Sequence, residues 1–95
     1  MSNSDAVFPT TFCYRLLALK GAGVAPRVIE YFAKRGLVPD RFDCRAGTET
    51  MSIDVEVAGL DAAAARHIAR CLAALVEVER VALAEKKAEG SRASA

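Results

Sequence analysis

The chain has 95 residues, of which 53% are hydrophobic, and its 13 basic and 12 acidic side chains give a formal net charge of +1. This length suits one small domain with a modest core, which association with a second copy would help to complete. Because the basic residues form no block, we expect no nucleic-acid partner. Because no apolar run is long enough to span a bilayer, we expect no membrane partner.

Three cysteines, Cys13, Cys44 and Cys71, are widely spaced and odd in number. No CxxC pair and no signal-peptide pattern accompanies them, so we expect no disulfides and a cytoplasmic location. Free cysteines are among the most frequently buried residue types, and all three are therefore predicted to be small core residues.

The first part of the chain predicts a strand and a turn. Residues 1–10 are expected to be flexible, whereas residues 11–20 (TFCYRLLALK) have the aromatic and branched composition of a strand. With Arg15 directed away from the core, the two-residue period of a strand directs four residues inward: Phe12, Tyr14, Leu16 and Ala18. Gly21 and Gly23 then predict a sharp turn that uses positive φ.

A helix over residues 24–35 follows the turn. Pro26 suits its first turn, and Gly36 is predicted to be the C′ residue that ends it. Helical spacing predicts an apolar face with five members: Ala25, Val28, Ile29, Phe32 and Ala33. Because a glycine turn that leads into a helix directs several free N–H groups to one point, this segment is a candidate site for an anionic group such as a carboxylate.

Two alternating stretches, residues 41–46 and 51–58, predict a β-hairpin around the turn 47–50. Alternation of this kind indicates a sheet with one covered face. The residues expected on the covered face are Phe42, Cys44, Ala46, Met51, Ile53, Val55 and Val57. On the open face we expect four charged side chains: Arg41, Arg45, Asp54 and Glu56. They form either cross-strand ion pairs or a solvated surface, in which each pair contributes roughly a few tenths of a kcal/mol to stability.

The last third of the chain predicts a second helix and a short strand. Asp61 is the expected N-cap, and the apolar stripe of this helix is expected to contain Ala64, Ala65, Ile68, Leu72, Leu75 and Val76. Residues 78–84 predict the last strand, so that the folded domain spans residues 11–85 and residues 86–95 form a flexible tail. The order β-α-β-β-α-β predicts an α+β, ferredoxin-like fold, a four-stranded antiparallel sheet with two helices on one face.

Two segments of the sequence have the pattern of a known family. Residues 23–36 (GVAPRVIEYFAKRG) match Gly-hydrophobe followed by Arg-Val-(Ile/Leu)-x-x-(Phe/Val)-x-x-Arg-Gly, and residues 75–81 (LVEVERV) match Leu-hydrophobe-(Asp/Glu)-Val-x-x-Val. With the predicted element order, these segments resemble an ACT domain. More narrowly, they resemble the regulatory small subunit of acetolactate (acetohydroxyacid) synthase, over roughly residues 11–85.

This resemblance implies a non-catalytic regulatory module of branched-chain amino acid biosynthesis without a cofactor of its own. It implies a homodimer or higher homo-oligomer that docks on a thiamine-diphosphate-dependent catalytic subunit. It also implies an amino-acid effector, held by the turn before the first helix, often across a dimer interface. The corresponding residues here are Lys20, Gly21, Ala22, Gly23 and Val24, with Lys20 at the position where the family has Asn.

Other interpretations of the sequence stay open. The glycine turn is alternatively a simple connection, and the domain is alternatively a free-standing amino-acid sensor that acts on another partner. A third alternative is an RNA- or metal-binding ferredoxin-like domain, although the aromatic pattern of RNA-binding strands and the CxxC of metal carriers are missing. His67 is the one histidine, and nothing in the sequence places it against an exposed cysteine. We therefore expect neither an enzyme nor a metal site.

Overall fold

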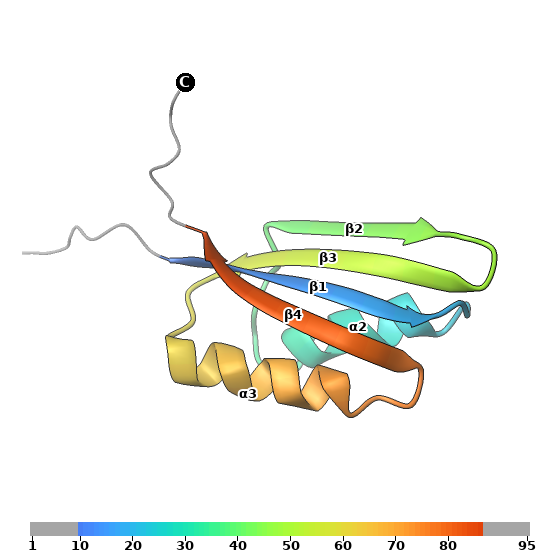
Figure 1. Ribbon diagram of the computed structural model, residues 1–95. Coiled ribbons are helices and arrows are strands. Elements are labelled where there is room, and N and C mark those ends of the chain that lie inside the picture. Colours follow the sequence, from blue (N-terminus) through green and yellow to red (C-terminus); the bar gives the residue numbers. More distant parts are fainter. Residues whose placement is uncertain (1–9, 87–95) are drawn as a thin grey trace, which may run out of the picture.

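The computed structural model of the chain describes residues 10–86. The expected flexible segments 1–10 and 86–95 fall almost wholly outside these residues. Within them, the six elements follow in the predicted order (Figure 1): β1 (Thr11–Leu19), α2 (Val24–Ala33), β2 (Arg41–Ala46), β3 (Thr50–Ala58), α3 (Ala62–Ala73) and β4 (Val78–Lys86).

The four strands form one sheet in the order β2-β3-β1-β4, and every neighbouring pair is antiparallel. Both helices lie on the same side of this sheet, which leaves the other side open (Figure 1). The predicted α+β, ferredoxin-like fold is therefore confirmed. The pairing of β1 with β4 is irregular at one point, because its register shifts between Leu17 and Ala18.

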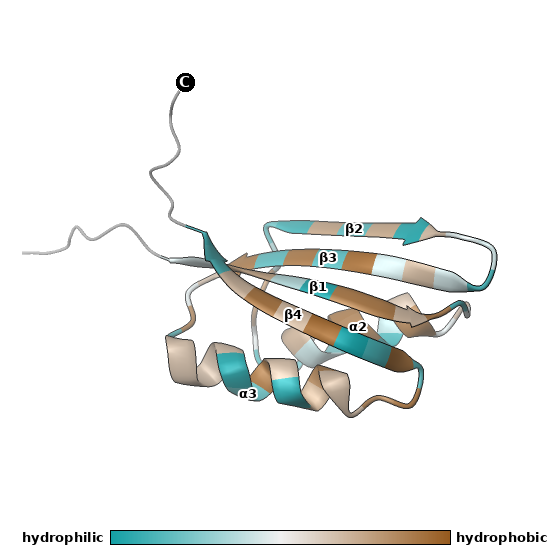
Figure 2. Cartoon of the chain, in the orientation of Figure 1, coloured by the Kyte–Doolittle hydropathy of each residue, from teal (hydrophilic) through white to brown (hydrophobic). Residues whose placement is uncertain are grey.

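The core lies between the central strands and the helices. The inward residues of β1 and β3 alternate as predicted and are buried (Figure 2 shows hydrophobic segments interleaved with polar ones along both strands). Tyr14 packs edge-to-face against Phe32, with the two ring centroids 5.4 Å apart. The Tyr14 hydroxyl donates a 2.9 Å hydrogen bond to the carbonyl oxygen of Ala65. Burial raises the pKa of Tyr14 to about 12, because the charged phenolate loses its hydration there.

The buried face of α2 differs from the predicted one. Val24, Val28 and Phe32 are buried, whereas Ile29 is 39% exposed and Ala33 is exposed. The helix begins at Val24, and residues four apart stand one above the other on a helix, so the stripe that starts at Val24 faces the sheet. Ile29 lies about 100° further around the helix and reaches solvent.

Both helix ends follow local chemistry that the sequence predicts. Asp61 caps α3 by accepting a 2.8 Å hydrogen bond from the N–H of Ala64. At the end of α2, Gly36 has a φ of +71°. The N–H of Gly36 donates a hydrogen bond to the carbonyl oxygen of Ala33, and the N–H of Leu37 donates one to the carbonyl oxygen of Phe32. This pair of hydrogen bonds is the Schellman arrangement with Gly36 at C′, as predicted.

The end of α3 and the last strand differ from the prediction. The helix stops at Ala73, so Val76 lies beyond it and is 91% exposed instead of forming part of the apolar stripe. Strand β4 continues through Lys86, two residues past its predicted end and one past the predicted limit of the domain. Pairing with the full length of β1 accounts for the extension, since Lys86 lies opposite Thr11.

The prediction that all three cysteines are core residues is wrong. Cys13 and Cys71 are half-buried and Cys44 is exposed. Cys13 alternates with the buried residues of β1 and lies on the open face, where partial burial raises the pKa of its thiol. Cys44 lies opposite the buried Ile53, on the helix side of the sheet. Because β2 is an edge strand, solvent still reaches the helix side of this strand.

Candidate functional site

The glycine turn joins β1 to α2 at one end of the sheet. The hairpin between β2 and β3 and the loop that leads into β4 lie at the same end (Figure 1). Main-chain hydrogen bonds hold the three segments together, because the N–H of Lys20 donates to the carbonyl of Glu49 and the N–H of Leu19 donates to that of Glu77. The turn is therefore fixed at its β1 side by two neighbouring loops.

The turn does not use the geometry that its glycines predict. Only Gly36 and Gly59 have positive φ among the glycines of the described residues, and the prediction of positive φ at Gly21 and Gly23 is wrong. Gly23 is the N-cap of α2 with φ −89°, and no side chain caps the helix. The two glycines instead keep the backbone uncovered, since Gly21, Ala22 and Gly23 are all exposed.

The free donors of the turn come from its main chain. Within residues 10–86, Gly21, Ala22, Gly23 and Ala25 donate no backbone hydrogen bond. Pro26 has no N–H to offer. These unsatisfied N–H groups at a helix N-terminus form an environment that favours a negative group.

The five predicted site residues have unequal access to this space. Lys20 is exposed and directly precedes the glycines, so its ammonium group is available to an anion. Val24 is 3% exposed and its N–H donates to the carbonyl of Gly21 at 3.3 Å. Val24 therefore belongs to the core, and the accessible part of the predicted site is residues 20–23.

Arg27 is a site residue that the sequence reasoning missed. A Cβ atom placed on Gly23 would lie 3.8 Å from an Nη atom of Arg27, so the guanidinium lies beside the turn. The same guanidinium donates a 2.7 Å hydrogen bond to Glu77, and this interaction lowers the pKa of the Glu77 carboxyl. The signal in the sequence was a basic residue in the first helical turn, four positions after Gly23. The turn thus has the exposed Lys20 directly before it in the chain and the guanidinium of Arg27, paired with Glu77, beside it.

A protein-family model described as an ACT-like domain matches residues 6–90. The chain belongs to the ACT-like domain family. ACT domains are regulatory modules, in agreement with the predicted class of function. No curated protein matches the chain.

Solved structures share the fold of this ACT-like domain. The ACT domain of GTP pyrophosphokinase from Chlorobium tepidum superposes with a TM-score of 0.71 at 9% identity, over 80% of this chain and 99% of that one. The C-terminal domain of the MgtC protein from Mycobacterium tuberculosis gives 0.68 at 13% identity, over 97% and 100%. A homoserine dehydrogenase from Thiobacillus denitrificans gives 0.63 at 18% identity, over 87% of this chain and 18% of that one.

Elsewhere in the ACT-like domain, His67 and Cys71 lie one helical turn apart on α3. Their Nε2 and Sγ atoms are 3.6 Å apart, a proximity that the sequence analysis did not foresee. Within residues 10–86 no three His, Cys, Asp or Glu side chains gather as a metal site. No helix in this range has the length and apolar character needed to cross a membrane.

Proposed function

We propose that this ACT-like domain is a non-catalytic regulatory subunit that acts in the cytoplasm on a biosynthetic enzyme. An amino-acid effector binds at the turn formed by residues 20–23, with its carboxylate on the free N–H groups and its position secured by Lys20 and Arg27. The partner is the catalytic subunit of acetolactate synthase. Regulation is then a coupling free energy between effector binding and the active state of the enzyme.

The uncapped N-terminus of α2 carries the effector part of this proposal. Its N–H groups lack acceptors within residues 10–86, Lys20 directly precedes them in the chain, and the guanidinium of Arg27 lies beside Gly23. A carboxylate bound there exchanges water for charge-assisted hydrogen bonds, which are stronger than neutral ones. Lys20 can attract and hydrogen-bond a carboxylate, but its flexible ammonium lacks the fixed amide geometry and the acceptor of the Asn that the family uses, so we expect weak binding by one copy alone.

The partner part of the proposal is supported by context. The similar domains in Chlorobium tepidum and Thiobacillus denitrificans belong to enzymes, and the sequence of residues 23–36 and 75–81 resembles the acetolactate synthase small subunit. Strands β2 and β4 are the two sheet edges, whose outer N–H and C=O groups are available to a second copy. A homodimer formed through an edge would continue the sheet from one copy into the other.

Thermal unfolding tests effector binding. A ligand that binds only the folded state raises the unfolding midpoint, so one amino acid from a full panel, branched-chain ones included, should raise it selectively. Lys20→Ala should reduce the shift, whereas Lys34→Ala, which alters an exposed lysine at the far end of α2, should leave it unchanged. No shift with any amino acid would overturn the effector proposal and favour a turn that only connects β1 to α2.

Co-purification tests the partner. The domain should associate with the catalytic subunit of acetolactate synthase and change its activity. Absence of association and of any effect on activity would refute this partner. If an amino acid still binds, the domain is the free-standing sensor that acts on another protein. An RNA-binding role finds no support, because β1 directs Phe12 and Tyr14 into the core and offers no aromatic side chain on the open face for stacking.

A further inference from the structure

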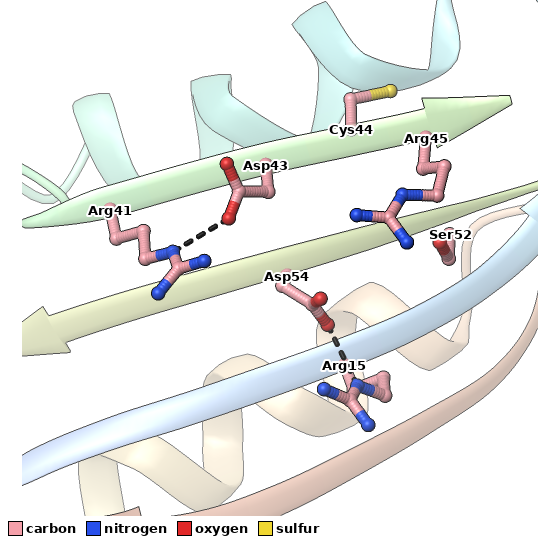
Figure 3. Close-up of a pocket in the computed structure, with 7 residues that line it drawn as sticks. All are labelled: Arg15, Arg41, Asp43, Cys44, Arg45, Ser52 and Asp54. Carbon is pink, nitrogen blue, oxygen red and sulfur yellow. Dashed lines mark hydrogen bonds and ion pairs between the residues drawn. The ribbon is translucent and has the colours of Figure 1, made fainter.

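One of the three cysteines, Cys44, borders a charged hollow on the open face of the sheet. In this hollow Asp43 accepts a 2.6 Å hydrogen bond from Arg41. Asp54, opposite Asp43 in the register, accepts one of 2.8 Å from Arg15. Figure 3 shows that the sulfur of Cys44 is directed away from these charged side chains. The charged groups therefore bind one another, and the thiol of Cys44 does not join them.

Cys71 differs from Cys44 because an imidazole lies beside its thiol. His67 and Cys71 are four residues apart on α3, a spacing that places both side chains on one side of a helix. The Nε2 atom of His67 lies 3.6 Å from the Sγ atom of Cys71. With a Zn–N bond of about 2.0–2.1 Å and a Zn–S bond of about 2.3 Å, two ligands of a tetrahedral zinc ion are about 3.5 Å apart. The two atoms thus already have the separation that ligands of one zinc ion require.

The pair is accessible from outside the domain. His67 is exposed and Cys71 is half-buried. Cys71 lies in the last turn of α3, where the carbonyl end of the helix dipole favours a cation. Ala63 and Ala74, one turn before His67 and one turn after Cys71, are exposed and have short side chains. A second helix can therefore approach this side of α3 to the usual interaxial distance of about 8–10 Å.

Charge determines how many thiolates the site needs. Within residues 10–86 no three His, Cys, Asp or Glu side chains gather, so one copy offers two ligands of the four. Arg66 and Arg70, both exposed, directly precede His67 and Cys71, about 100° around the helix. A zinc ion with one thiolate and one neutral imidazole keeps a net positive charge, which these guanidinium groups disfavour. With two thiolates and two neutral imidazoles the site is neutral.

We propose that a zinc ion joins two copies of this chain at α3, with His67 and Cys71 of each copy as its four ligands. Each thiol gives its proton to solvent as the ion binds. Two cysteines and two histidines are a ligand set of structural zinc sites, and thiolate and imidazole select zinc over magnesium or calcium. The expectation of no metal site considered the one histidine of a single chain, and a second copy supplies another. The site uses none of residues 20–23 and does not depend on the proposed effector.

Zinc titration of the full chain tests this site. The chain is first treated with EDTA and kept reduced with a phosphine, which excludes disulfides. Zinc chloride should double the mass measured by analytical ultracentrifugation relative to the EDTA-treated chain, with one ion bound per two chains. EDTA should reverse the change. Cobalt(II) in place of zinc should give the visible absorption of a tetrahedral ion and a thiolate charge-transfer band.

Substitutions of the two ligands, with a matched control, complete the test. Cys71→Ser and His67→Gln should each weaken zinc binding at least about 100-fold, because loss of even an outer-shell partner costs about 10–100-fold. His67 is exposed, so His67→Gln should melt like the original chain in EDTA and tests the site even if Cys71→Ser does not fold. Cys44→Ser removes an exposed thiol and should bind zinc as the original does.

Three results would overturn the site. The first is a mass that zinc does not change, and the second is one bound ion per chain. The third is a doubling of mass that persists in both His67→Gln and Cys71→Ser, which would place the metal elsewhere. None of these results bears on the effector proposal, which the amino-acid panel and Lys20→Ala test separately.

Discussion

The hydroxyl of Tyr14 donates a buried hydrogen bond of 2.9 Å to the main-chain carbonyl of Ala65, 51 positions further along the chain. Tyr14 stands in the central strand β1 and its ring contacts Phe32 of α2. One side chain therefore links the sheet to both helices. Because Ala65 presents only a methyl group at its buried position, the backbone of α3 comes within reach of the phenol.

Tyr14→Phe should destabilise the domain by about 1 kcal/mol, because it removes a buried hydrogen bond while keeping the aromatic packing. For a domain of this size, that loss lowers the melting temperature by roughly 4–8 °C. Thermal unfolding followed by circular dichroism measures it. Tyr31→Phe is the matched control, since Tyr31 is half-buried and its hydroxyl forms no hydrogen bond within residues 10–86. Equal effects of the two substitutions would contradict the role of the Tyr14 bond.

The raised pKa of Tyr14, about 12, predicts a loss of stability in alkali. The unfolded tyrosine ionises near its usual value of about 10, while the folded one keeps its proton. Over this interval the unfolded state binds fewer protons, so the free energy of unfolding falls as pH rises from about 10 to about 12. Urea unfolding at about pH 9 and about pH 11 should show a smaller decrease in Tyr14→Phe than in the original chain or in Tyr31→Phe. An identical decrease in all three would contradict the assignment.

The elements and their order followed from the sequence because local signals agree with one another. Two-residue alternation predicted the inward residues of β1 and β3, Asp61 predicted the start of α3, and Gly36 predicted the end of α2. The wrong predictions concern residues whose burial depends on where their helix or strand lies relative to the others. Cys44 alternates like a core residue, but only the sheet order shows that its strand is an edge. Val76 fits the apolar spacing of α3 in the sequence, but the helix ends at Ala73, before this residue is reached.

The face of α2 gives a direct test of one such correction. Val28→Ala should cost roughly 2 kcal/mol, because it removes two buried methyl groups and leaves a cavity. Ile29→Ala removes more side chain but at an exposed position, so we expect a change within about 0.5 kcal/mol. Chemical denaturation of both variants measures the difference. If Ile29→Ala lost more stability than Val28→Ala, Ile29 would be buried, either in the core as helical spacing alone predicted or against a second copy.

The candidate sites were predictable only in part. The glycine turn is visible in the sequence, but the ion pair that holds Arg27 beside it joins residues 50 positions apart. The opposition of Asp43 and Asp54 likewise depends on the register of the β2–β3 hairpin. Charges on one strand face are readable from alternation, whereas their partners on the next strand require the register. Contacts between residues far apart in the sequence therefore determine which polar side chains lie close together at the turn and on the open face of the sheet.

The two kinds of glycine in this chain should respond differently to alanine. Gly36→Ala should destabilise the domain by about 1–2 kcal/mol, because φ +71° is a left-handed conformation that a Cβ atom disfavours. Gly23→Ala should be within about 0.5 kcal/mol of the original, since its φ is negative and a Cβ there meets only the movable end of Arg27. Equilibrium unfolding compares them. A large loss in Gly23→Ala would show that the turn depends on glycine flexibility after all, and weakened effector binding with unchanged stability would place its uncovered backbone in the binding site.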